Sequence, residues 1–435
     1  MGDLSKKELR ELIDTLYPFN YSITGEGNDN AAEVLKSILD FEIYSWSSGL
    51  EMNGWVIPNS TTVKNAKIEK DGKLIYDGTL SPLRLPSLCP SFKGSLSLDK
   101  LQNHIFSQPN LPDSVPTHWS NLYRPKKEWG FCMPHNLRKN LKQGSYDITI
   151  ETEERPWEMK VLIFTLPGKS KETIILNAHN CHPFQANDDV SGMAVGISLM
   201  KKLAAKTDRF YTYCLLIAPE LHGPMFWLNS LDDDKVSDIK SVILFKSVGN
   251  SSDLKLQRSF DEDSLVCKVA DHVFSRRYEQ YDAGPFRSIY GNDETVFEAL
   301  PYRIPSISLT RWPFKEYHTD FDTPDRISTD HLHDTLLTAE EICDTLEMTR
   351  HFEPKFRGLV CLSKYDLYLQ PSISSDGSLD SHSPQGRLFR LMNSLPSLLG
   401  EDYDILKISE EFDLPVRQIY DYLMRWEAAG LLEKK

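Results

Sequence analysis

The chain has 435 residues, of which 40% are hydrophobic and 26% are charged, and its formal net charge at pH 7 is −14. This length exceeds what one hydrophobic core usually supports, so we expect two or three globular domains. The acidic balance argues against a general affinity for nucleic acid or anionic membranes, because both bind clustered Lys and Arg. The seven cysteines form no C-x-x-C pair, which predicts no disulfide framework and no structural zinc site and fits a reducing compartment.

The first elements in the chain are expected to be helices. Apolar residues recur at helical spacing over residues 4–17 and 30–41, with a glycine-rich turn at 22–27 between them. The N-terminal segment mixes acids with its bases, unlike a signal peptide, and apolar runs such as residues 214–219 are too short to cross a bilayer. We therefore expect a cytoplasmic protein without a membrane partner.

The next part of the chain has a different composition and a different hydrophobic pattern. From about residue 55 to 150, prolines are dense and short β-like runs replace helical periods, as in residues 66–78 with their Asp-Gly turn. This change predicts a β-rich module at 55–150 that is inserted into the first domain. The expected catalytic domain is then discontinuous and comprises residues 1–54 and 151–369.

Buried strands alternate with helices from about residue 157 onward. Strands are expected at 160–167, 173–179, 211–219, 241–248 and 303–311, and helices at 190–206, 226–231 and 329–351. Such alternation is typical of a mostly parallel sheet that is covered on both faces. The predicted fold class is therefore α/β.

The C-terminal part is expected to form a separate winged-helix domain at 384–435, after a Ser-, Asp-, Gly- and Pro-rich linker at 370–385. From Arg387 to the end, seven Lys and Arg residues stand against nine acids. Its candidate recognition helix has two cations, Arg417 and Arg425, whereas DNA binding needs several on one face. Nucleic acid is thus not the expected partner, and protein contact or a homo-oligomer formed through this domain is the favoured use.

Metal-ligand side chains follow the expected strands. His179 and His182 come after one strand, Asp188 lies shortly before the next helix, and His318 follows the last strand. In open α/β sheets the functional crevice lies at the carboxyl ends of the strands, so these loops should converge. Imidazole and carboxylate are the ligands of catalytic zinc, which keeps one position open for water. His179 or His182, together with Asp188 and His318, would provide three ligands.

A carboxylate at the end of another buried strand, Glu220, has little structural use there but could take a proton from water beside a metal. Structural alternatives exist for each of these residues. Asp188 or Asp189 could be the N-cap of the following helix, a single histidine could be a satisfied polar residue, and Glu220 could be a solvated loop residue. The coincidence of three such loops on this scaffold favours a metal site.

Together these motifs resemble a known series. The pattern H-x-x-H-P, A-N-D-D-x-S-G, P-E-x-x-G and Y-H-T-x-x-D-T is similar to the metal-site series of the co-catalytic di-zinc aminopeptidases. The chain is more similar still to a bacterial family described as polysaccharide-biosynthesis proteins with an aminopeptidase-like domain. That resemblance spans nearly the whole chain and includes residues 22–27, 55–58, 129–132 and 292–294 and the C-terminal winged helix. It implies a central sheet of the zinc-aminopeptidase type.

The resemblance also implies roles, residue by residue. His179 stands where the aminopeptidases have their first zinc histidine, and Asp188 where they have the metal-bridging aspartate. Glu220 matches the general base and His318 the last zinc histidine. Tyr317 resembles the tyrosine that steadies the tetrahedral intermediate.

The chain departs from the aminopeptidase pattern at three positions. Cys181, with His182 beside it, replaces the aspartate that follows the first histidine, and Leu221 replaces the second glutamate of the pair. Residues 246–249, Lys-Ser-Val-Gly, have no carboxylate where a zinc-binding aspartate is expected. We therefore expect about one zinc per chain and doubt a second site.

Three further residues are candidates for substrate contact. Asp293 and Glu294 could bind substrate or replace a missing ligand, or could form an ordinary turn. Arg311, with Trp312 beside it, could bind an anionic or sugar-like substrate, or could form an ion pair beside a packed ring. P-loop and Rossmann glycine patterns are absent from the sequence, so no nucleotide cofactor is implied.

The sequence as a whole predicts a zinc-dependent hydrolase that cleaves an amide or peptide-like bond in a small-molecule or peptide-like substrate. The named resemblance adds polysaccharide biosynthesis as a setting. One alternative is a non-catalytic binding or regulatory protein that keeps the aminopeptidase fold and uses the winged helix as its output. Another is an esterase or deacetylase that uses the same metal site.

Overall fold

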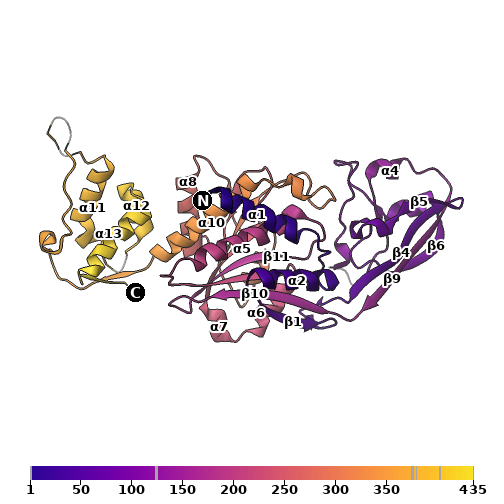
Figure 1. The fold of residues 1–435 in the computed structure, drawn as a ribbon, viewed down its shortest axis with the longest axis horizontal. Helices are drawn as coiled ribbons and strands as arrows, with labels where there is room; N and C mark the ends of the chain where they lie inside the picture. Colours follow the sequence, from indigo (N-terminus) through magenta and orange to yellow (C-terminus); the bar gives the residue numbers. More distant parts are fainter. Residues whose placement is uncertain (1, 123–125, 374–376, 379, 401–402, 435) are drawn as a thin grey trace. The chain divides into compact units, whose positions relative to one another are not determined.

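The computed structural model describes residues 2–122, 126–373, 377–378, 380–400 and 403–434 (Figure 1). The chain forms two compact units: residues 1–262 with 281–337, and residues 263–280 with 338–435. Helix α10 (Thr329–Met348) begins in the first unit and ends in the second. Residues 263–280 and 338–369, which we expected in the catalytic domain, thus lie in the second unit, and the domain boundaries given above stay a prediction.

The first unit is built on an eight-stranded sheet with the order β1-β10-β12-β11-β13-β16-β14-β15. Neighbours pair in parallel from β12 through β11 and β13 to β16 and between β14 and β15, and the other pairs are antiparallel. The sheet is therefore mixed, and the expected parallel arrangement holds at its centre. Its strands are β1 (Glu42–Ser47), β10 (Glu158–Leu166), β11 (Thr173–His179), β12 (Thr212–Ala218), β13 (Ile239–Lys246), β14 (Leu254–Gln257), β15 (Ala283–Gly284) and β16 (Ser306–Arg311).

Alternate side chains of the central strands point to opposite faces of the sheet, and both faces are buried because helices cover them. Leu215 faces helix α5, where its methyl group lies 2.8 Å from the position of a Cβ atom on Gly196. The next residue, Leu216, packs with Trp227 on the other face. Figure 1 shows α1 and α5 on one side of the sheet and α6 and α7 on the other. These helices are α1 (Gly2–Leu16), α5 (Ser191–Ala204), α6 (His222–Ser230) and α7 (Asp233–Asp238).

The second helix of the chain, α2 (Glu26–Ile38), begins earlier than the predicted 30–41. Gly25 is its N-cap, with a φ of 146° that residues with a Cβ atom rarely adopt. The glycines that we read as a turn therefore begin a helix. Gly27 lies in the first turn of α2, where a Cβ atom would stand 2.0 Å from the carbonyl oxygen of Asn20.

The β-rich segment has a sheet of its own, with the antiparallel order β5-β4-β9-β6. One core cluster, which includes Ile68, Phe131 and Ile148, packs within this segment. The strands are β4 (Ser60–Lys70), β5 (Lys73–Asp77), β6 (Phe92–Ser97) and β9 (Ser145–Arg155), and the connecting pieces include α3 (Leu98–Leu101), β7 (Ile105–Phe106), β8 (Phe131–Cys132) and α4 (His135–Lys139).

The second unit has three C-terminal helices followed by a short strand. That strand, β18 (Leu432–Lys434), pairs antiparallel with β17 (Phe352–Pro354), which precedes the predicted linker. The helices are α11 (Pro384–Leu398), α12 (Ile405–Phe412) and α13 (Val416–Ala428), and α8 (Leu265–Arg277) belongs to the same unit. The winged-helix assignment stays a prediction, and part of the predicted linker (374–376 and 379) lies outside the described residues.

Every helix among the described residues is too short or too polar to cross a bilayer.

Candidate metal centre

Polar side chains gather where the central parallel strands end. His179 is the last residue of β11, Lys246 is the last residue of β13, and Glu220 follows β12 by two residues. Because β11 lies between β12 and β13, these three ends are neighbours at one edge of the sheet. Asp188, just before α5, and His318, in the loop after β16, join them. The structure thus brings together the loops that the sequence predicts to converge.

Asp188 connects two imidazoles. Its Oδ1 atom lies 3.2 Å from Nε2 of His179, and its Oδ2 atom lies 3.0 Å from Nε2 of His318. His182 is close to a second carboxylate, with Nε2 3.6 Å from Oε2 of Glu220. Two groups, His179–His182–Glu220 and His182–Asp188–His318, each have one ligand atom per residue within 4.8 Å of the others. His182 belongs to both groups.

The inner part of the cluster has unpaired polar atoms. Nε2 of His179 and Oδ1 of Asp188 are buried and lie 3.2 Å apart, but among the described residues neither meets the geometry of a hydrogen bond. Such unpaired buried groups are uncommon and cost about 1–3 kcal/mol each. Imidazole with carboxylate is a donor set that suits zinc. The residues present therefore fit a metal ion.

The neighbouring carboxylate, Asp189, supports the start of α5, whose N-cap is Val190. Asp189 accepts a hydrogen bond at Oδ1 from the backbone N–H of Gly192 (3.1 Å), in the first turn of α5. It also accepts one from the N–H of Ser247 (3.1 Å). Asp189 therefore ties the helix start to the end of β13, whereas Asp188 turns its oxygens toward His179 and His318.

Two contacts from distant segments fix these groups. The carboxylate of Asp322 accepts hydrogen bonds from the backbone N–H groups of Asn187 (2.8 Å) and Asp188 (3.1 Å). The indole N–H of Trp119 donates to Nδ1 of His318 (2.9 Å). A neutral His318 ring then carries its proton on Nε2 and donates it to Asp188. Metal binding at Nε2 would move that proton to Nδ1 and break the bond from Trp119.

Lys246 places a positive charge between the two carboxylates. Its Nζ atom lies 3.4 Å from Oε1 of Glu220 and 3.8 Å from Oδ1 of Asp188, and the side chain is 2% exposed. Burial raises the pKa of Glu220, but the Lys246 ammonium together with His179 and His182 outweighs it, and the net pKa is below the ordinary value. Burial also raises the pKa of Asp188, but the same ammonium and the three neighbouring histidines together hold it well below its usual range. Both carboxylates are therefore ionised at neutral pH.

The inner histidines are neutral. Burial lowers the pKa of His182 to about 3. Burial, followed by repulsion from Lys246, also lowers the pKa of His179. Neutral imidazole is the form that binds metal, so neither ring has to lose a charge at neutral pH before it can act as a ligand.

Three non-glycine residues at this edge of the sheet adopt positive φ angles. They are Leu221 (60°), Ser247 (53°) and His318 (55°). The first two directly follow Glu220 and Lys246. Such conformations cost about 1–3 kcal/mol each and gather at functional sites, where the surroundings hold them in place.

Two tyrosine hydroxyls complete the cluster. The hydroxyl groups of Tyr317 and Tyr290 are hydrogen-bonded to each other. The Tyr317 ring is stacked on His318 with a centroid distance of 3.7 Å, and the Lys246 ammonium lies 4.4 Å from the centroid of Tyr290. Burial raises the pKa of both phenols, with a further rise from the charge of Asp188. Both side chains therefore stay protonated and can donate hydrogen bonds.

The predicted substrate-contact residues have protein partners. Asp293 accepts the backbone N–H of Leu221 at 2.6 Å, and burial, together with the charge of Glu220, raises the pKa of Asp293 to about 8. Both oxygens of Glu294 accept the N–H of Asn292 (2.8 Å). These contacts favour the turn alternative for Glu294 and make Asp293 a support of the loop after Glu220.

Arg311 is also bound to protein. It forms a 2.7 Å ion pair with Asp334 and donates to the carbonyl oxygens of Ser252 (2.8 Å) and His331 (3.3 Å). These partners favour the ion-pair alternative over substrate contact. Its role in substrate binding stays a prediction.

Sequence reasoning missed several members of the cluster. Lys246 entered the sequence analysis only as part of a segment that lacks the expected zinc-binding aspartate. A single charged residue at the end of an apolar strand is itself an indication of a functional site. Asn292, which donates to Oε1 of Glu220 at 2.9 Å, lies in a segment that the resemblance included but to which no role was given. Trp119 and Tyr290 had no local signal.

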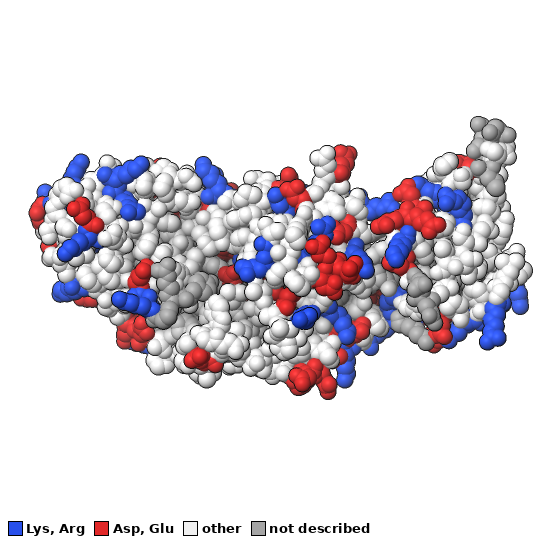
Figure 2. Space-filling view, turned by 180° about the vertical axis from the view of Figure 1, so that it is seen from behind, with Lys and Arg blue, Asp and Glu red and all other residues white. Residues whose placement is uncertain are grey.

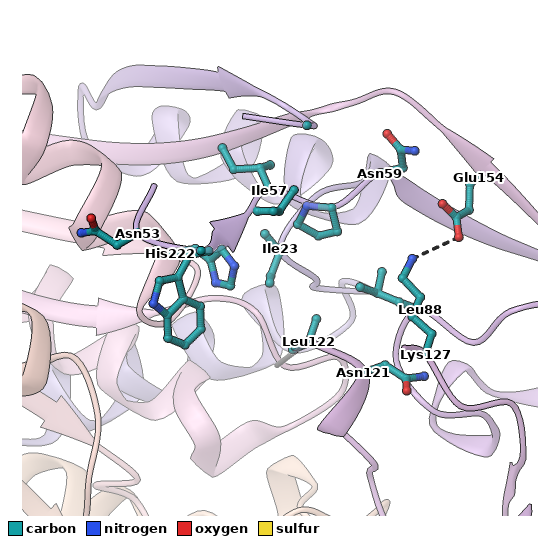
Figure 3. Close-up of a pocket in the computed structure, with 15 residues that line it drawn as sticks. Ile23, Asn53, Ile57, Asn59, Leu88, Asn121, Leu122, Lys127, Glu154 and His222 are labelled. Carbon is teal, nitrogen blue, oxygen red and sulfur yellow. Dashed lines mark hydrogen bonds and ion pairs between the residues drawn. The ribbon is translucent and has the colours of Figure 1, made fainter. Parts of the chain in front are cut away.

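A cavity of about 610 Å³ lies beside segments that carry site residues (Figure 3). Its lining includes His222, two residues after Glu220, and Leu122, three residues after Trp119. The rest of its wall is mostly apolar, and Lys127 and Glu154 form an ion pair of 3.1 Å at one side. This volume is in the range of small-molecule sites.

Comparisons with known proteins give a family and a fold. A family model described as a domain of unknown function, DUF4910, matches residues 10–349. A curated protein of Clostridium acetobutylicum, provisionally named a polysaccharide biosynthesis protein with an aminopeptidase-like domain, is 27% identical over 348 residues and is matched over 79% of each chain.

Solved structures are similar over the same region or more. The crystal structure of a protein of Clostridium acetobutylicum, provisionally described as a peptidase, has a TM-score of 0.82 at 23% identity and is matched over 100% of this chain and 97% of that one. A zinc aminopeptidase from Bacillus subtilis has a TM-score of 0.59 at 13% identity, with 80% and 95% covered. The first unit has the mixed α/β fold of the zinc aminopeptidases, and the chain belongs to the DUF4910 family.

Proposed function

We propose that this protein is a zinc-dependent hydrolase that cleaves an amide or peptide-like bond. The observation that carries the proposal is the buried cluster of imidazoles and ionised carboxylates, in which His182, Asp188 and His318 have ligand atoms within 4.8 Å of one another and Glu220 lies beside them. Three imidazoles and two carboxylates that converge in a buried site form a donor set that suits zinc. The aminopeptidase-like fold supports the proposal.

The residues proposed to hold zinc are His182, Asp188 and His318, with His179 beside Asp188. Bound zinc lowers the pKa of a water ligand and polarises a carbonyl group. Glu220 is proposed as the general base, because it is ionised and reaches His182 of the same cluster. Its carboxylate accepts a proton from the attacking water and passes it to the leaving nitrogen.

Other side chains position the reacting groups. Asn292 and Lys246 hold Oε1 of Glu220, which leaves Oε2, the oxygen facing His182, for the proton. The Tyr317 hydroxyl is a donor that can stabilise negative charge on the substrate oxygen in the tetrahedral intermediate, as the family resemblance suggests. Tyr290 orients it through the hydroxyl–hydroxyl bond.

The substrate is proposed to be a small-molecule or peptide-like conjugate of a glycan precursor, made or processed in the cytoplasm. Support comes from the name of the curated relative and from the cavity lined by residues close in sequence to Glu220 and Trp119, which has room for a small-molecule group. The second unit is proposed as a surface for protein contact or self-association.

A second candidate is a non-catalytic binding protein with the same fold. The observations that favour it are Leu221 and residues 246–249, which have no carboxylate where the aminopeptidase pattern has one. Zinc content and turnover separate the two functions. Purified protein is assayed on aminoacyl amides, N-acyl amino sugars and the corresponding esters, before and after chelation and zinc addition.

The hydrolase proposal expects turnover of an amide that chelation removes and zinc restores. Turnover of esters alone would favour the esterase alternative. Bound zinc without turnover of any of these substrates would favour the binding protein. Absence of zinc after reconstitution would rule out the metal centre itself.

A further inference from the structure

The two candidate ligand groups pose a question of stoichiometry. They share His182, but each has a carboxylate of its own, Glu220 in one and Asp188 in the other. Two carboxylates and three imidazoles could in principle hold one metal ion or two. The side chain that reaches both carboxylates is Lys246.

We propose that the ammonium group of Lys246 is the fixed second cation of this centre and limits it to a single divalent metal ion. This inference rests on the proposed metal site and deepens it. The ammonium lies 3.4 Å from Glu220 and 3.8 Å from Asp188, so one positive charge already compensates a carboxylate from each group.

The position of this charge is fixed by the fold. Lys246 ends β13, a central strand with β11 on one side and β16 on the other, and its side chain is 2% exposed. The ring of Tyr290 lies 4.4 Å from the ammonium. The charge cannot swing into solvent without opening the cluster. Lys246 is therefore a built-in ion that the protein cannot release, in contrast to a metal.

Electrostatics then selects between the two ligand groups. A divalent ion bound to Glu220 would stand next to the ammonium, and buried like charges a few ångströms apart repel strongly because little solvent screens them. Asn292 and Lys246 also occupy Oε1 of Glu220. The His182–Asp188–His318 group has Oδ2 of Asp188 on the side of His318, away from these contacts. The single metal ion belongs there, and Glu220 stays free to act as a base.

The test is the metal content of the full-length protein. Wild-type protein and Lys246→Met are saturated with zinc, freed of excess by buffer exchange, and measured by elemental mass spectrometry. Methionine keeps much of the length and volume of lysine but removes the charge. We expect about one zinc per chain in the wild type and a rise toward two in Lys246→Met.

Two further variants are controls. Lys246→Arg keeps the positive charge and should keep one zinc. Lys240→Met removes a lysine from the same strand whose side chain is 45% exposed, and it should leave the metal content unchanged. A content that stays at one in Lys246→Met, with unchanged zinc affinity, would overturn the proposal.

Titration of wild-type protein with cobalt(II), followed by its visible absorption, tests the same point without a variant. A break at one equivalent supports the proposal, and a break at two equivalents overturns it even if Lys246→Met does not fold. Two zinc ions in the wild type would remove this inference but leave a metallohydrolase. No bound metal would remove the proposed function and this inference together.

Discussion

At the scale of single residues, Glu220 and Asp188 are both ionised carboxylates of one buried cluster, yet they have different neighbours. Asp188 lies against two imidazoles, as a ligand would, whereas Glu220 lies against one imidazole, one amide and one ammonium. We expect Glu220→Gln to bind zinc normally and to lose about 10²–10⁴-fold in kcat, because an amide cannot accept the proton.

Asp188→Asn should show the opposite effect, with weaker zinc binding, because it removes negative charge from the metal site. Zinc content and kcat, measured for both variants, separate a base from a ligand. Loss of zinc from Glu220→Gln would make Glu220 a ligand. Unchanged turnover in that variant would end the proposed mechanism.

Trp119 offers a second test at this scale. Its indole N–H donates to Nδ1 of His318, and that bond has to break when zinc binds at Nε2. We expect Trp119→Phe to bind zinc more tightly, because the variant has no such bond to lose. One hydrogen bond contributes about 0.5–1.5 kcal/mol, so the gain in affinity should be at most about tenfold. Competition with a chelating dye measures it, and weaker binding would contradict the predicted cost of breaking this bond.

The residue types of the site were predictable, but their neighbours were not. Strand ends and loop motifs pointed to His179, Asp188, Glu220 and His318, because parallel strands bring their carboxyl ends together. The contact of Trp119 with His318 joins positions 199 residues apart, and no local pattern encodes it. The roles of these residues stay predictions, whereas their proximity is a property of the structure.

At the scale of elements, predictions held where the sequence carried a long apolar run. Strand β11 (Thr173–His179) coincides with the predicted 173–179, and β12 and β13 lie within two residues of their predicted bounds. Strands β1, β14 and β15 were not predicted. They are edge strands or neighbours of the edge that have two to six residues. Pairing with neighbours, more than their own residues, holds such strands in the sheet.

The carboxylate of Glu298, directly after helix α9 (Glu294–Phe297), is hydrogen-bonded to strand β16 and makes stability depend on pH. Glu298 accepts hydrogen bonds from the N–H groups of Phe260 (2.8 Å) and Ser306 (3.1 Å). Burial nevertheless raises its pKa from 4.5 to about 7. The folded state thus holds this proton more tightly than the unfolded state, and its contribution to stability falls as pH rises from about 4.5 to 7.

The stability of Glu298→Gln relative to the wild type should therefore be higher at pH 8 than at pH 5. The expected change in that difference is about 1–2 kcal/mol, after allowance for partial exposure of the carboxylate. Urea unfolding at both pH values measures it. The exchange Glu262→Gln at an exposed position corrects for the loss of one negative charge. A difference that is constant with pH would contradict the assignment.

At the scale of the whole molecule, the distribution of charge bears on partners. The net charge is −14, and Lys and Arg are interspersed with Asp and Glu on the face shown in Figure 2. In the second unit, several cations have acidic partners. Arg276 and Arg387 both contact Asp413, and Arg417 lies 3.6 Å from Asp344. Binding DNA would have to break these ion pairs as well as overcome the net charge.

We therefore expect the protein to bind DNA with a dissociation constant of about 10 µM or higher at 150 mM salt, which is no tighter than ordinary non-specific binding. Fluorescence anisotropy with a labelled duplex of mixed sequence measures the affinity. The same titration at 50 mM salt supplies the control, because any weak binding that appears there should fall steeply with added salt. Binding below 1 µM at 150 mM salt, with preference for one sequence, would instead make the C-terminal helices a DNA-reading module. In that case the three acid-paired arginines would be the first residues to exchange, since each would have to leave its carboxylate to reach a phosphate.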